Sequence, residues 1–118
     1  MCACAIAASI GVGCGYCYLL GLGLDHVEKT IHNIVGSIGG TLCDGAKFGC
    51  AMKLSTATGV AIEAARLAQL GRAVPRGDGI VCYSADETIA MLGRIASPGM
   101  VSANEYMAQE IISRENAR

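Results

Sequence analysis

Two cysteines, an aspartate and a lysine lie within one short stretch, Cys43 to Cys50, around an Asp-Gly pair. A fully helical stretch would place the two sulfur atoms about 10 Å apart, two turns along the helix. An Asp-Gly turn that leads into a helix instead brings both thiols to the helix N-terminus, with Asp44 as the cap. The free backbone N–H groups there favour thiolates and bound anions, and Lys47 adds a positive charge. The stretch therefore predicts a site for an anionic cofactor and an anionic substrate.

The chain contains seven cysteines in 118 residues, at positions 2, 4, 14, 17, 43, 50 and 82. We do not expect a secreted disulfide scaffold, because the number is odd and no basic segment of a signal peptide precedes the apolar first residues. Apolar residues also make up 53% of the chain, which is enough for an ordinary core. We expect a reducing, cytoplasmic compartment, in which some thiols bind a metal or cluster and others fill space in the core.

The charged side chains are few and balanced, with nine basic and ten acidic residues and a formal net charge of −1. This balance provides no attraction for nucleic acid or for an anionic membrane, so we expect neither partner. Residues 1–24 carry no charge and could span a bilayer as a helix. However, Gly11, Gly13 and Gly15 each weaken an isolated helix by about 1 kcal/mol relative to alanine. We predict a helix wrapped on all sides by other protein, which needs more protein than the rest of the chain supplies.

Apolar residues at helical spacing and capping residues predict four further helices. These run from Asp25, with Glu28 in a capping box, to Gly39; from Asp44 to Gly71, with Gly59 as an interruption; from Ser84, with Glu87 in a capping box, to Pro98; and from Ser102, with Glu105, towards the end of the chain. Residues 72–83 predict a loop, and no segment alternates long enough for a strand. The predicted class is all-α, with a central apolar Ala/Gly-rich helix surrounded by amphipathic helices in a single domain over residues 1–118.

The segment around the Asp-Gly turn resembles a known signature. The run from Cys43 to Lys47 (CDGAK), followed by Gly49-Cys50-Ala51 and Lys53, resembles the CDGAK-x-x-CA-x-K motif of the L-cysteine desulfidases. These enzymes are similar in their α domain to the iron–sulfur L-serine dehydratases. Residues 3–8 (ACAIAA) resemble the cysteine-bearing helix of both families, and the pattern continues to Gly99-Met100. The resemblance covers essentially the whole chain, but only the C-terminal part of the family's chain.

The resemblance implies a [4Fe–4S] cluster held by Cys4, Cys43 and Cys50, with one iron open to the substrate. The implied activity is the α,β-elimination of L-cysteine to pyruvate, ammonia and sulfide, in which the open iron acts as a Lewis acid. An L-serine dehydratase fragment is the alternative, and it would release water instead of sulfide. Cys2 competes with Cys4 as the third ligand, since both cysteines lie beside alanines and only the family pattern prefers Cys4. The catalytic base is not identifiable.

Several other residues have two possible interpretations. Lys47 can hold the substrate carboxylate or neutralise the site, and Asn33 can face the substrate or make a hydrogen bond between helices. For His32 we expect a surface position. Cys14 and Cys17 form a C-x-x-C pair, which we expect to be small buried residues, and Cys82 is expected to be structural.

The resemblance also implies a missing part. In the desulfidases, further residues of the active site lie in an N-terminal portion, so we expect this chain to be the C-terminal part of a larger enzyme, completed by that portion or by a partner subunit. Two other classes stay open. One is a non-catalytic assembly module whose Ala/Gly helix pairs with itself or with a partner. The other is a structural zinc or redox protein that uses Cys14, Cys17, Cys43 and Cys50.

Overall fold

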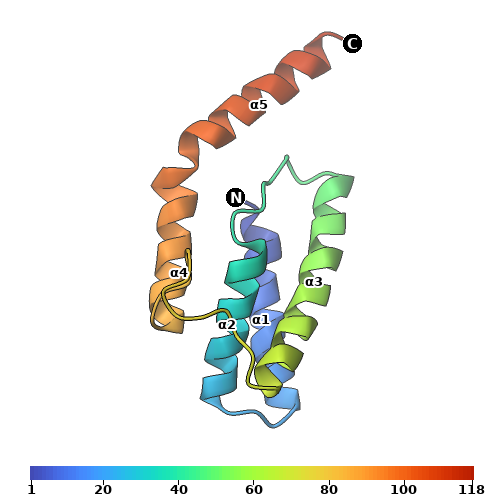
Figure 1. The fold of residues 1–118 in the computed structure, drawn as a ribbon. Helices are drawn as coiled ribbons and strands as arrows, with labels where there is room; N and C mark the ends of the chain where they lie inside the picture. Colours follow the sequence, from blue (N-terminus) through green and yellow to red (C-terminus); the bar gives the residue numbers. More distant parts are fainter.

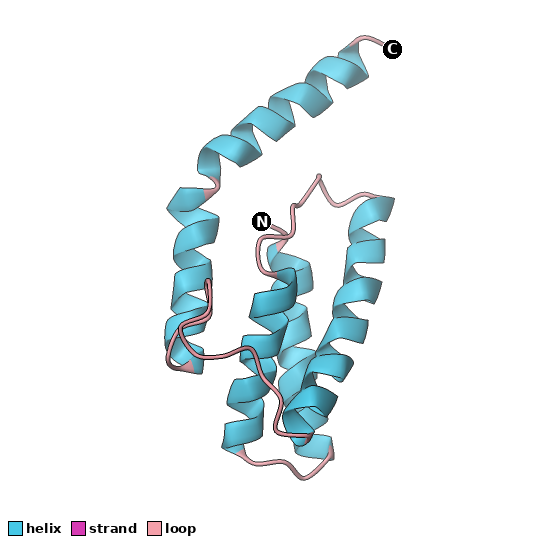
Figure 2. Ribbon diagram, viewed as in Figure 1, coloured by secondary structure: helices cyan, strands magenta, loops and turns pink.

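The computed structural model describes residues 1–118, and its regular structure is helical throughout (Figures 1 and 2). The elements are α1 (Ala3–Leu19), α2 (Leu24–Ile38), α3 (Phe48–Gln69), α4 (Ala85–Arg94), the short π-helical segment η1 (Ile95–Gly99) and α5 (Val101–Asn116). The predicted all-α class is confirmed. None of the helices combines the length and the hydropathy that a membrane crossing requires.

Helices α1, α2 and α3 pack pairwise against one another, and α4 packs on the other side of α2 (Figure 1). Helix α2 is therefore covered from several directions, and all its residues from Thr30 to Val35 are buried. The largest apolar cluster joins Ile6 of α1, Ile31 and Val35 of α2, and Leu92 of α4. His32, expected at the surface, is only 2% exposed, so that prediction is wrong; a residue of a helix with neighbours on several faces has little access to solvent.

The buried face of α3 consists of alanines. Their positions follow the helical repeat: Ala57, Ala61, Ala64, Ala65 and Ala68. The larger residues Ile62 and Leu67 are about 40% exposed, at 41% and 39% respectively. Because alanine side chains are short, α3 can lie close to α1 and α2, as the cluster of Ile34 with Ala61 and Ala64 shows.

Helix α1 is covered by α2 and α3 on one side only. Gly13 faces α2 so closely that an added Cβ atom would lie 2.8 Å from carbon atoms of Ile34 and Thr30. On the other side, a Cβ atom added at Gly11 or Gly15 would meet no atom within 4 Å. The sequence predicts a first helix surrounded by protein on all sides, but in this chain it is covered on one side only.

The helix ends follow the predictions in part. The capping box of Ser84 and Glu87 is present at α4, and residues 72–83 form a loop. Helix α3 continues through Gly59 without interruption. Asp25 lies inside the first turn of α2, where it pairs with Lys29, and does not cap that helix. The last helix begins at Val101 without a side-chain cap.

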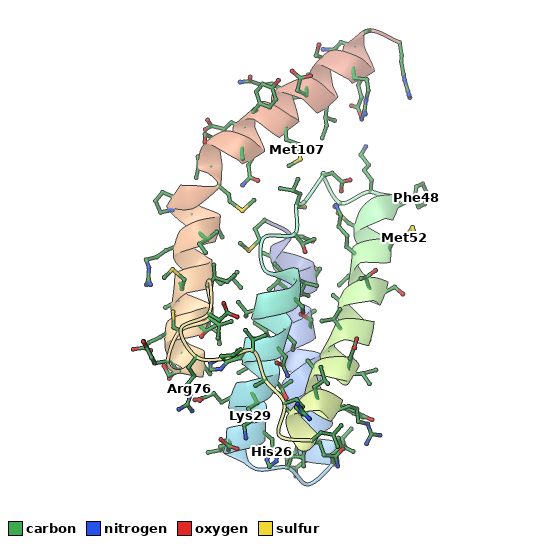
Figure 3. The ribbon with its side chains drawn as sticks, viewed as in Figure 1. His26, Lys29, Phe48, Met52, Arg76 and Met107 are labelled. Atoms are coloured by element: carbon green, nitrogen blue, oxygen red, sulfur yellow. The ribbon has the colours of Figure 1, made fainter.

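Helix α5 extends away from the other helices and buries none of its residues (Figure 1). Among the helical elements, it packs only against η1. The Cα radius of gyration is 15.6 Å, whereas a compact chain of this length has about 13.5 Å. The half-buried residues of α5 are Asn104, Met107 and Ile111, which share one helix face. Met107 projects from α5 toward the loop before α3 (Figure 3).

Candidate functional site

Three thiols converge where the chain enters α1 and α3. The sulfur atoms of Cys2, Cys43 and Cys50 all lie within 4.8 Å of one another, and those of Cys43 and Cys50 are 4.0 Å apart. Cys2 immediately precedes α1, and its backbone N–H donates a 2.6 Å hydrogen bond to the carbonyl of Thr41. This bond joins the two ends of the site, which are far apart in the sequence.

The turn between Cys43 and α3 has an unusual backbone. Gly45 and Ala46 both have positive φ angles, of 98° and 55°. Consecutive residues of this kind point their N–H groups to one side and form a concave site for an anion. Here the N–H groups of Gly45 and Ala46 lie on the side of the Cys43 sulfur and lower the pKa of that thiol. Asp44 does not cap α3, because the helix begins only at Phe48 and Lys47 takes the cap position, so the predicted cap is wrong.

The turn makes the two neighbouring thiols unlike each other. Hydrogen bonds from the backbone N–H of Gly45, and then of Ala46, lower the pKa of Cys43, because they stabilise its thiolate. A hydrogen bond to the carboxylate of Asp44 instead raises the pKa of Cys50, because the carboxylate favours the protonated thiol. Cys43 is therefore the first of the pair to ionise as the pH rises.

Asp44 links Cys50 to a lysine. Its Oδ1 atom accepts a hydrogen bond of 3.3 Å from the thiol of Cys50 and one of 2.9 Å from the ammonium group of Lys53. The Lys53 contact lowers the pKa of Asp44, so this side chain is a carboxylate at neutral pH. From the sequence we assign no role to Lys53. Its spacing could have indicated one, because it lies three residues after Cys50 and therefore on the same helix face.

Lys47 lies at the edge of the site. Its side chain is 68% exposed, and its ammonium group is 3.8 Å from the carboxylate of Glu115 on α5. Two of the cavities that it lines are also lined by cysteines. One, of about 300 Å³, is also lined by Cys2, Cys4, Cys43 and Cys50. The other, of about 390 Å³, lies between the turn and α5 and is bounded by Cys43, Asp44 and Met107 among others. A positive charge beside both cavities can attract an anionic ligand.

Cys4, which the family pattern favours as the third ligand, does not belong to the group of three sulfur atoms. Its side chain is exposed on the first turn of α1, although it lines the cavity of about 300 Å³. Cys2 and Cys4 lie two residues apart on either side of the start of α1, so their side chains point in different directions. The geometry therefore favours Cys2 over Cys4.

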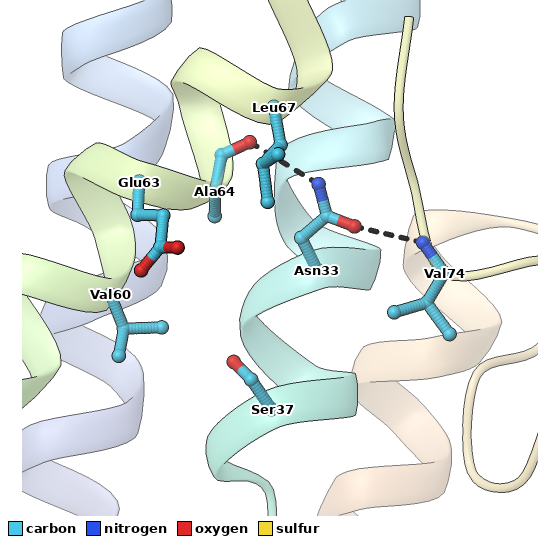
Figure 4. A pocket seen from close by; sticks show the side chains of 7 residues that line it. All are labelled: Asn33, Ser37, Val60, Glu63, Ala64, Leu67 and Val74. Atoms are coloured by element: carbon cyan, nitrogen blue, oxygen red, sulfur yellow. Dashed lines mark hydrogen bonds between the residues drawn. The ribbon is translucent and has the colours of Figure 1, made fainter.

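Asn33 lies in a different cavity from the thiols. Its side-chain nitrogen donates to the carbonyl of Ala64 at 3.2 Å, and its oxygen accepts from the N–H of Val74 at 2.8 Å (Figure 4). The same nitrogen also donates to the carbonyl of Arg72 at 3.1 Å. The cavity beside it, of about 220 Å³, is lined by Ser37 and Glu63 but by none of the cysteines. The amide of Asn33 is thus engaged with backbone groups that join α2, α3 and the loop after α3.

The other cysteines lie apart from the three-thiol group. Cys17 is fully buried, and its sulfur is 3.1 Å from the hydroxyl oxygen of Thr30. Cys14 is half-buried, and burial raises the pKa of its thiol, so it is a poor metal ligand. Cys82 is half-buried in the loop before α4. A zinc site that combines Cys14 and Cys17 with Cys43 and Cys50 is therefore not formed.

The donor set suits a thiophilic metal centre. Three convergent sulfur atoms are typical ligands for iron–sulfur clusters and for zinc. The lowered pKa of Cys43 and the N–H groups that face its sulfur favour the thiolate form that such centres bind. The residues present therefore fit a cluster held by cysteines, and Cys2, Cys43 and Cys50 are the residues that could hold it.

Fold and site together define an all-α domain with a three-cysteine centre at one end. Residues 1–108 match the family described as the serine dehydratase alpha chain, and the chain belongs to this family.

The curated relatives carry the name UPF0597 protein. The relative from Alkaliphilus oremlandii is 38% identical over 98% of this chain and 27% of its own length. The relative from Methanocella arvoryzae is 41% identical over 93% of this chain and 26% of its own length. The chain thus spans about a quarter of the length of the curated relatives it matches. No solved structure matches it.

Proposed function

We propose that this chain is the cluster-binding part of an iron–sulfur amino-acid lyase that eliminates the β-substituent of L-cysteine, with release of pyruvate, ammonia and sulfide. The observation that supports it most is the convergence of Cys2, Cys43 and Cys50 at a turn whose N–H groups stabilise a thiolate. The match to the serine dehydratase alpha chain supports the lyase class. The CDGAK resemblance supports cysteine as the substrate.

Each residue of the site has a proposed task. Cys2, Cys43 and Cys50 would hold a [4Fe–4S] cluster, with three protein ligands for its four iron atoms. When bound, such a cluster supplies a Lewis acid for an elimination. Lys47 attracts the carboxylate of the amino acid into the adjoining cavities, because its ammonium group is exposed beside both of them. For Asn33 we propose that it holds the helices that carry the turn rather than the substrate, because its amide is engaged with three backbone groups.

The active enzyme is proposed to need more protein than this chain. The chain covers only about a quarter of its relatives' length, and the desulfidase pattern assigns further active-site residues to an N-terminal portion. We therefore propose that this chain is the C-terminal part of a larger, cytoplasmic enzyme and that the remaining portion completes the substrate site.

Anaerobic reconstitution with iron and sulfide tests the cluster assignment. We expect a broad visible absorption that Cys2→Ser, Cys43→Ser and Cys50→Ser each abolish. Cys82→Ser is the matched control, since Cys82 lies outside the group, and it should keep the absorption. If Cys4→Ser removes the absorption and Cys2→Ser does not, the third ligand is Cys4 and the chain rearranges on loading. If the chain takes up zinc but no cluster, the lyase proposal is wrong.

The family description favours a second candidate, L-serine dehydratase. The two reactions differ in the leaving group, which is sulfide from cysteine and water from serine. The loaded chain, combined with the remaining portion of a full-length relative, is given each amino acid in turn. Pyruvate formed with an equal amount of sulfide from L-cysteine supports the desulfidase. Pyruvate from L-serine alone supports the dehydratase.

A further inference from the structure

Asp44 and Lys53 belong to the sequence motif, yet neither has a task in the proposed reaction. We propose that they are positioning residues: Lys53 fixes the carboxylate of Asp44, which in turn holds the sulfur of Cys50 toward Cys43 and Cys2. The hydrogen bonds of 2.9 Å from Lys53 and 3.3 Å from Cys50 meet on the same oxygen, Oδ1 of Asp44. The idea that these residues serve a cluster rests on the proposed function. The idea that they orient the thiol of Cys50 is independent of it.

The local backbone places the three groups in reach of one another. Cys50 and Lys53 are three residues apart on α3, so their side chains lie on one face, one turn apart. Asp44 precedes the helix, and its carboxylate lies against the first turn at Gly49. A Cβ atom added at Gly49 would be 3.4 Å from Oδ2 of Asp44, an ordinary van der Waals distance. The carboxylate of Asp44 therefore lies directly against the first turn of α3.

The two lysines of the motif are not equivalent. The side chain of Lys53 is 26% exposed and makes a short contact, whereas that of Lys47 is 68% exposed and lies 3.8 Å from its partner. A covered lysine in a short ion pair holds its partner in one position more firmly than an exposed one. Lys53 thus has the surroundings of a positioning residue, and Lys47 has those of a ligand-attracting one.

Lys53 also balances charge. A cysteine that binds a metal has lost its proton and is negatively charged. Without Lys53, the carboxylate of Asp44 would then repel the sulfur of Cys50 at this short distance. With Lys53 bound to the carboxylate, the pair is neutral and can stay beside the ligand. The same two residues can therefore orient Cys50 before loading and tolerate its charge afterwards.

Cross-linking of the metal-free chain tests this inference without any cluster. Dibromobimane alkylates two neighbouring thiols, with loss of two bromides and two protons, and its fluorescence then rises. In a background with Cys2→Ser and Cys4→Ser, the cross-link between Cys43 and Cys50 is measured by fluorescence and assigned by mass spectrometry. Its rate is divided by the rates of single alkylation of Cys43 and of Cys50, so that changes in the reactivity of either thiol are corrected for.

We expect Lys53→Met and Asp44→Ala each to slow the normalised cross-linking by about three- to ten-fold. Lys53→Arg should restore it. Lys29→Met is the matched control, because Lys29 also pairs with an aspartate, at 2.6 Å, but on α2 and outside the thiol group. This control should cross-link at the parent rate. Far-UV circular dichroism checks folding, and Lys53→Gln with Asp44→Asn replace any variant that does not fold.

Unchanged cross-linking in Lys53→Met, or equal slowing in Lys29→Met, would overturn the inference. The visible absorption of the reconstituted chain is an independent measurement. This absorption should fall in Lys53→Met and persist in Lys53→Arg. If the parent chain takes up no cluster, the proposed function fails. The metal-free cross-linking still decides whether Asp44 and Lys53 position Cys50.

Discussion

Asn33→Ala distinguishes a structural role from a substrate-binding one. Asn33 is 6% exposed, and its amide makes three hydrogen bonds, with Ala64, Arg72 and Val74. Each bond contributes about 1 kcal/mol net, and buried groups left without partners cost about 1–3 kcal/mol more. We therefore expect Asn33→Ala to lower the free energy of unfolding by about 3 kcal/mol.

Urea unfolding of the metal-free chain measures this change. With a slope of about 1–3 kcal/mol per molar urea, the midpoint should fall by about 1–3 M. Ser37→Ala is the control, because Ser37 lines the same cavity one turn along α2 and makes one 3.1 Å bond to its own helix. It should change stability by about 0.5 kcal/mol or less. A loss below about 1 kcal/mol in Asn33→Ala would refute the structural role. A raised KM in the completed enzyme with stability intact would restore the substrate role.

Three further predictions concern α1 and the turn. Gly13→Ala should lower the free energy of unfolding by about 1–3 kcal/mol, because its Cβ meets side chains of α2. In Gly15→Ala the added Cβ atom meets no other atom, so this variant should raise the free energy of unfolding by up to about 1 kcal/mol. If the urea midpoints of the two variants moved in the same direction, the packing described for α1 would be contradicted. Iodoacetamide should label Cys43 before Cys50 as the pH rises, since the pKa of Cys43 is lowered and that of Cys50 raised; peptide mass spectrometry showing the reverse order would reject this assignment. Ala46→Gly should raise the urea midpoint, by about 0.5–1 kcal/mol in unfolding free energy, because Ala46 has φ = 55°; an unchanged or lower midpoint would show that the turn is not strained there.

The helical class and some of the helix ends could be predicted from local sequence signals. Ser84 and Glu87 form a capping box because a hydroxyl and a carboxylate three residues apart can satisfy each other's backbone N–H groups. Gly71 follows α3 with φ = 74°, the conformation that often ends a helix at a glycine. Such signals depend on neighbours in the chain and need no knowledge of the packing.

The packing itself was less predictable. On α3 the alanines are buried, whereas the larger side chain of Leu67 is 39% exposed. The local pattern does not reveal how closely two helices approach, and close approach selects small residues. Asp44 shows the same limit. Its type and position fit a helix cap, yet contacts with Lys53 and Cys50 compete for its carboxylate.

The choice between Cys2 and Cys4 depended on a contact distant in the sequence. Their surroundings in the sequence are alike, and only the bond from the N–H of Cys2 to Thr41 brings one of them to the turn. Cys2 is also packed with Ala5 and Ala57, against which Cys43 lies. The group of three sulfur atoms is thus built partly from core residues. A larger side chain at Ala57 would disturb the packing of α1 on α3 and would also move the proposed ligand Cys2. Since a metal centre there would bind the folded chain and not the unfolded one, loading should stabilise this part of the core, and loosening the core should weaken the centre.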